Sequence, residues 1–146
     1  MTKSWAERHQ DDAIAMMTRR DRRIYAALAL GTIGLGLLGR RAAWMPSFFA
    51  ANAGDALYAT LVFWLLAIAV PLARAQHLAI VTFCACAAIE LSQAWHAEWL
   101  LALRRTALGP LVLGTTFAAE DFPRYLAGVA IALIVDRHVR GWRPTR

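Results

Sequence analysis

The chain has 146 residues, of which 59% are hydrophobic, and it carries a formal net charge of +6. Soluble domains are usually about 45–50% apolar even with glycine counted, so an ordinary soluble fold is disfavoured. The apolar excess lies in blocks, as membrane-spanning segments do, and the length suits one domain. The basic residues flank these blocks and form no stripe on a soluble element, so we expect no nucleic-acid partner.

Four apolar blocks of helical length are separated by polar or broken segments. They predict an all-α fold, an integral membrane four-helix bundle. The blocks are residues 24–39, 56–73, 78–95 and 122–135. We therefore divide the chain into a polar cytoplasmic leader (1–23), a four-span membrane domain (24–136) and a basic cytoplasmic tail (137–146).

The segments between these blocks differ in character. Residues 42–54 are predicted to be a loop, with Asp55 as the N-cap of the second helix. Residues 97–119 contain Gly109-Pro110, which breaks a helix, yet they are too apolar for a free loop. We predict a short re-entrant or interfacial segment there, between helices 3 and 4, and Asp121 as the cap of the last helix.

The distribution of basic residues predicts the orientation. With four spans and both termini cytoplasmic, eleven of the 16 Lys and Arg residues fall on the cytoplasmic side and five on the outer side. Cytoplasmic segments of membrane proteins carry such an excess. Both termini are therefore predicted to be cytoplasmic.

That topology brings several polar residues toward the outer side of the membrane. A carboxylate at membrane depth is costly and normally faces a partner or a wet cavity. We expect Arg104 to pair with Glu90, Asp121 or both, because arginine binds carboxylates in a bidentate manner. The predicted binding or structural polar network consists of Asp55, Glu90, Gln93, His96, Arg104 and Asp121.

Motifs for metal, cofactor or nucleophilic chemistry are not found in the sequence. Cys84 and Cys86 are two apart and lack zinc-site spacing, and Glu90 and His96 are six apart, which is not the spacing of a helical zinc pair. Neither a nucleophile elbow nor a phosphate loop occurs. We predict no metal and no cofactor, and an enzyme is the less favoured reading.

The region from Glu90 to Gly128 resembles a known pattern. Together with Gly54-Asp55, it is similar to the VanZ-like membrane proteins, and it resembles more closely a related bacterial family, domain of unknown function 2809. The residues that carry the closer resemblance are Glu90, Ser92, Gln93, His96, Ala97, Trp99, Leu100, Ala102, Leu103, Arg104, Leu108, Gly109, Leu111, Val112, Leu113, Gly114, Phe117, Asp121, Tyr125 and Gly128. Leu101 and Ala107 depart from it, where an acidic and a basic residue would be expected.

The resemblance implies a compact four-span bundle in the bacterial cytoplasmic (inner) membrane, and it implies no reaction. Three functions stay open. The first is binding of an amphiphile, a lipid or glycan-lipid, whose anionic headgroup Arg104 and Arg105 would hold. The second is an intramembrane enzyme acting on a lipid, with Glu90 or Asp121 as general acid/base and His96 assisting. The third is an accessory subunit or oligomer that docks through glycine-rich helix faces. The alternative to all three is that the predicted polar network has a structural role alone and stabilises the fold.

Overall fold

A computed structural model describes residues 19–41, 47–114 and 116–141, and these residues form helices and connecting turns without a strand. The helices are α2 (Arg22–Arg41), α3 (Ser47–Ala69), α4 (Ala75–Gln93), α5 (Glu98–Arg104), α6 (Gly109–Leu113) and α7 (Asp121–Gly141). The predicted all-α class is confirmed. Predictions for residues 1–18, 42–46, 115 and 142–146 lie outside the described residues.

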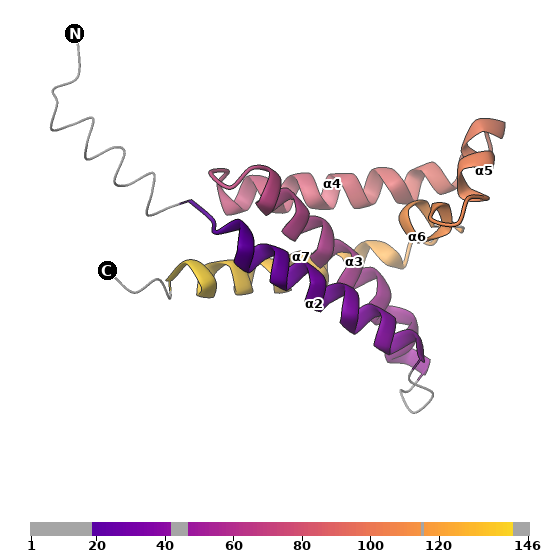
Figure 1. Cartoon of the computed structure of the whole chain (residues 1–146). Coiled ribbons are helices and arrows are strands. Elements are labelled where there is room, and N and C mark those ends of the chain that lie inside the picture. The colour runs from indigo at the N-terminus through magenta and orange to yellow at the C-terminus, as the bar shows by residue number, and fades with distance from the viewer. Residues whose placement is uncertain (1–18, 42–46, 115, 142–146) are drawn as a thin grey trace, which may run out of the picture.

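Helix α3 is the centre of the arrangement (Figure 1). It contacts α2, α7 and α4, and α7 also contacts α4. The short helices α5 and α6 lie beyond the C-terminal end of α4, on the far side from where the described chain enters α2 and leaves α7. The molecule therefore has two ends, which we call the Glu90 end and the Asp136 end after the carboxylate buried at each.

The start of α3 and the end of α7 differ most from the predicted boundaries. Helix α3 begins at Ser47, so residues 47–54 are helical and Asp55 is not an N-cap. The carboxylate of Asp55 instead accepts a hydrogen bond from Arg124 on α7. Helix α7 continues to Gly141, beyond the predicted end at residue 135, because Asp136 faces the interior and does not terminate the helix.

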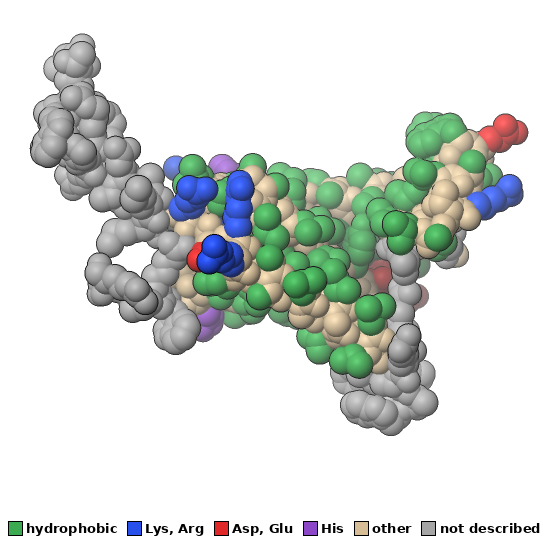
Figure 2. Space-filling model, in the orientation of Figure 1, with side chains coloured by type: hydrophobic (Ala, Val, Ile, Leu, Met, Phe, Trp, Pro, Cys, Tyr) green, Lys and Arg blue, Asp and Glu red, His purple; other side chains and the backbone are tan. Residues whose placement is uncertain are grey.

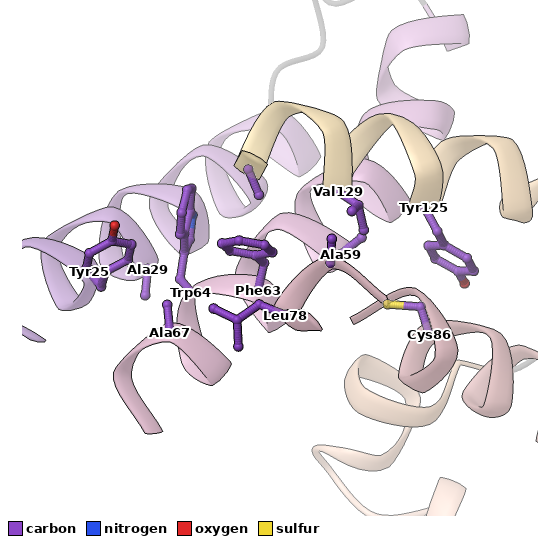
Figure 3. Packing of buried hydrophobic residues seen from close by; sticks show 12 residues of the cluster. Tyr25, Ala29, Ala59, Phe63, Trp64, Ala67, Leu78, Cys86, Tyr125 and Val129 are labelled. Carbon is purple, nitrogen blue, oxygen red and sulfur yellow. The ribbon is translucent and has the colours of Figure 1, made fainter. Parts of the chain in front are cut away.

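The core is built from residues at helical spacing on α3. Phe63 and Trp64 are buried, with ring centroids 5.4 Å apart in an edge-to-face arrangement, and Tyr25 of α2 lies 5.7 Å from Trp64 (Figure 3). Val129 supplies the α7 side of the same cluster. The indole of Trp64 donates to the Thr32 hydroxyl at 3.2 Å, so the largest core side chain has a polar partner as well.

A close backbone approach joins α3 to α7. A Cβ on Gly128 would collide with the backbone of Ala56. The hydroxyl of Thr60 lies 3.0 Å from the Gly128 carbonyl and 2.8 Å from the Ala56 carbonyl of its own helix. Only glycine permits this contact, and it sets the distance between the two helices near the Glu90 end.

The outer surface of the helices is strongly apolar. Large hydrophobic side chains are exposed on α2, α3, α4 and α7, and Figure 2 shows them along the length of the bundle. Lys and Arg side chains gather at the Asp136 end in the same view. Of the described helices, Ala75–Gln93 alone is long and apolar enough to cross a membrane by length and composition, and Ala53–Ala69 is a shorter apolar helix.

Candidate functional site

Glu90 is the centre of a buried polar group at the C-terminal end of α4. Its side chain is completely buried. Three donors reach its carboxylate: the Tyr125 hydroxyl at 2.8 Å, the Gln93 amide at 3.1 Å and the backbone N–H of Ala118 at 2.6 Å. All three are neutral, so the carboxylate is satisfied by hydrogen bonds without a direct cation.

Gln93 has an incomplete set of partners. Its amide nitrogen donates to Glu90, but its amide oxygen is buried and accepts no hydrogen bond within the described structure. The side chain lies against Gly114, whose φ is +64° and where a Cβ would overlap the Gln93 amide. Gly114 is therefore required both for the turn after α6 and for the space that Gln93 occupies.

Asp55 and Asp121 share one arginine beside this group. Arg124 Nη1 lies 3.2 Å from Asp55 Oδ2 and also pairs with Asp121, three residues earlier on α7. The exposed Glu120 approaches the other Arg124 nitrogen at 3.5 Å. Sequence reasoning missed Arg124, although its spacing of three and four residues from Asp121 and Glu120 indicates a helical ion pair.

The predicted pairing of Arg104 with Glu90 or Asp121 is wrong. The Arg104 guanidinium is largely buried, but it donates to the carbonyls of Ser92 at 2.7 Å and Trp95 at 3.3 Å. These carbonyls lie at the end of α4, where a helix leaves acceptors free and its dipole favours a positive charge. Arg104 therefore caps α4, and it forms no salt bridge with any residue that the structure describes.

His96 does not join the group. Its side chain is exposed just after α4, and none of the hydrogen bonds among the described residues involves it. Arg105 is also exposed. Of the six predicted residues, Glu90 and Gln93 are in direct contact, Asp55 and Asp121 meet through Arg124, and Arg104 and His96 lie outside both groups.

A second buried group at the Asp136 end was missed. Arg20 binds Asp136 through two hydrogen bonds of 2.7 and 2.9 Å and donates to the Ala73 carbonyl at 2.6 Å. The Tyr25 hydroxyl donates to the same carboxylate. Arg20 and Asp136 had been assigned to the polar leader and to the end of the last span, and no local pattern signals a pair 116 positions apart in sequence.

The described residues therefore form an all-helical protein with an apolar exterior and a carboxylate buried at each end. Residues 44–129 match the model of the family described as Protein of unknown function (DUF2809). The match covers more than half of the chain, so the protein belongs to this family, and the predicted resemblance to domain of unknown function 2809 is confirmed. No solved structure matches the chain.

The matched region contains the whole Glu90 group and Arg124, whereas Arg20, Tyr25 and Asp136 lie outside it. Around Arg124, acidic side chains outnumber basic ones: the carboxylates of Asp55 and Asp121 pair with it, and Glu90 lies nearby. Two buried polar atoms at this end have no hydrogen-bond partner within the described structure, the acceptor Gln93 Oε1 and the donor Arg104 Nε. Within the described part of the chain, no group of three His, Cys, Asp or Glu side chains is placed to hold a metal ion.

Proposed function

We propose that this protein is an integral membrane protein whose spans are α2, α3, α4 and α7, and that its Glu90 end binds the polar headgroup of an amphiphile. The exposed leucine and isoleucine side chains on all four helices support the spans, because such surfaces are rare on soluble proteins. The basic Asp136 end would face the cytoplasm and the Glu90 end the outer side.

The chemistry of the Glu90 end favours a headgroup that brings hydrogen-bond donors. The sequence had suggested an anionic headgroup held by Arg104 and Arg105, but both terminal nitrogens of Arg104 donate to carbonyls at the end of α4, and only its buried Nε lacks a partner among the described residues. In the group around Arg124, the carboxylates of Asp55 and Asp121 share a single arginine, and Glu90 lies close to them. An ammonium or hydroxyl-bearing headgroup therefore complements this end better than a phosphate alone.

The single observation that carries this proposal is the Gln93 amide oxygen. It is buried beside a fully buried carboxylate, and none of the residues that the structure describes donates to it. Leaving such an acceptor unpaired costs about 1–3 kcal/mol, and native proteins rarely retain that cost without a ligand, a water or a function. A donor from a headgroup would remove the penalty.

The experiment is native mass spectrometry of protein purified in mild detergent from its own membrane. We expect a bound lipid in the wild type, reduced in Asp55→Asn and in Gln93→Met, which keeps the side-chain volume but removes both the acceptor and the amide that donates to Glu90. Arg137→Gln is the matched control, because Arg137 is exposed on α7 at the Asp136 end, and it should retain the lipid. Equal lipid in all variants, or none in the wild type, would reject the proposal.

A further inference from the structure

The segment between α4 and the turn after α6, residues 95–114, has an apolar edge that no described residue covers. Five of its large side chains are exposed: Trp95, Trp99, Leu103, Leu108 and Val112. Trp95 and Trp99 lie edge to face, with ring centroids 6.2 Å apart. We call this surface the tryptophan edge.

The tryptophan edge is not the surface of a loosely attached loop. Arg104 ties α5 to the end of α4, and the Tyr58 hydroxyl of α3 donates to the Val112 carbonyl at 2.9 Å. Between α5 and α6, a Cβ on Gly109 would collide with the backbone of Leu103 and Arg104. A fixed backbone thus holds the apolar side chains outward. An exposed apolar surface of this kind marks a site that a membrane or a protein partner covers.

The length of α4 places this segment at a membrane boundary. Its 19 residues span about 28 Å as a helix, close to the roughly 30 Å thickness of a bilayer's hydrocarbon core. If α4 crosses the membrane, Trp95 follows directly at the level of the headgroups. Tryptophan is enriched at that level, because its ring is apolar and its N–H is polar.

Charged residues on the same segment oppose deeper insertion. Glu98 and Arg105 are both exposed, at the start and just after the end of α5. A re-entrant segment would carry them into the hydrocarbon core at high cost. In the headgroup layer, Arg105 can instead meet lipid phosphates while the apolar side chains enter the upper acyl region.

We infer that residues 95–114 form an interfacial anchor, with the tryptophan edge embedded in the headgroup layer of the outer leaflet. This inference rests on the four proposed spans and decides between the interfacial and re-entrant alternatives. It also specifies the source of the amphiphile: Gln93 packs against Gly114 of the anchor, so a headgroup reaches the Glu90 end from the adjacent leaflet.

Depth-dependent quenching in proteoliposomes tests the inference. A Leu108→Cys variant in a Cys84→Ala/Cys86→Ala background would be labelled with an environment-sensitive fluorophore and reconstituted with lipids bearing nitroxide at the headgroup, upper acyl chain or chain end. We expect headgroup and upper-chain nitroxides to quench most strongly. Cys86→Ala alone provides the control, because the natural Cys84 is exposed near the middle of α4 and should be quenched best by chain-end nitroxide.

The depth of quenching at positions 108 and 84 separates the anchor from the spans. Chain-end quenching at position 108 would overturn the interfacial placement in favour of a re-entrant segment. Absence of quenching at position 108 with deep quenching at Cys84 would also overturn it, while leaving the spans and the headgroup site intact. If Cys84 is not quenched either, the proposed spans fail and the anchor fails with them.

Discussion

Glu90 and Asp136 are both fully buried carboxylates, and a tyrosine hydroxyl donates to each. They differ in the charge of their other partners. Asp136 has a bidentate arginine, which neutralises it in place. Among the described residues, the donors that reach Glu90 are all neutral, so no arginine pairs with it directly. This contrast assigns a structural role to the Asp136 group and leaves the Glu90 group as the candidate site.

The Arg20–Asp136 pair should therefore stabilise the protein strongly. Arg20→Ala leaves a buried, uncompensated carboxylate, and we expect a loss of about 3–5 kcal/mol in the free energy of unfolding. Arg140 approaches Asp136 only at 4.0 Å and is partly exposed, so Arg140→Ala should cost less than about 1 kcal/mol. Denaturant unfolding in detergent would measure both. Equal effects of the two substitutions would contradict the structural role.

The Tyr125 hydroxyl should matter for stability in the same way. Tyr125→Phe removes one of three donors to a buried carboxylate, and we expect a loss of about 1–3 kcal/mol. Tyr58→Phe is the control, because its hydroxyl bonds to an exposed carbonyl at 2.9 Å that water can satisfy. Thermal unfolding in detergent would compare them, and a Tyr58→Phe loss as large as that of Tyr125→Phe would count against the Glu90 network.

The sequence predicted the contact between Glu90 and Gln93 within one helix, but it did not predict the partners that other helices supply. Glu90 and Gln93 are three apart in an apolar helix, which predicts that they share one side, and they do meet. The partner of a buried carboxylate depends on how helices pack. Arg104 was expected to pair because the predicted topology put it at the depth of Glu90 and Asp121. The free carbonyls at the end of α4 bind it instead, and Arg124 on another helix supplies the cation for Asp55.

Among the helices, the lengths of the apolar blocks predicted the existence of α2, α3, α4 and α7, while their ends depended on tertiary contacts. The roles of the glycines could not be predicted from spacing. Gly31, Gly34, Gly36 and Gly39 on α2 suggested a contact face, but a Cβ at each would meet nothing within 4 Å. Docking of a second copy or a partner subunit on that face stays a prediction.

The contrast between Gly128 and Gly31 gives a matched pair of variants. Gly128→Ala must push α7 away from the Ala56 backbone, and we expect a destabilisation of about 1–3 kcal/mol from overpacking. Gly31→Ala enters open space in a helix, where alanine is favoured over glycine by roughly 1 kcal/mol, so stability should be unchanged or increased. Thermal unfolding in detergent would separate them. A Gly128→Ala protein as stable as wild type would show that α3 and α7 are not packed as described.

At the scale of the whole molecule, the Arg20–Asp136 pair holds the start of α2 next to the last turns of α7. It joins the residues that precede α2 to the last turns of α7, and Arg20 also binds the α3–α4 turn through Ala73. Both ends of the described chain therefore lie at one end of the bundle (Figure 1), and the proposed four spans would put them on the same side of a membrane. The concentration of basic side chains at that end predicts that it faces the cytoplasm.

Cysteine accessibility tests this orientation, with Cys84 and Cys86 replaced by alanine. Gln76→Cys lies exposed at the start of α4 near the Asp136 end, and Thr106→Cys lies exposed between α5 and α6 at the Glu90 end. We expect a membrane-impermeant maleimide to label Thr106→Cys in intact cells and Gln76→Cys only after permeabilisation, which also controls for thiol reactivity. Labelling of Gln76→Cys alone in intact cells would invert the orientation and place the anchor in the cytoplasmic leaflet. Labelling of both in intact cells would contradict a bundle that separates two sides of a membrane, because the two positions lie at opposite ends of the same helical core.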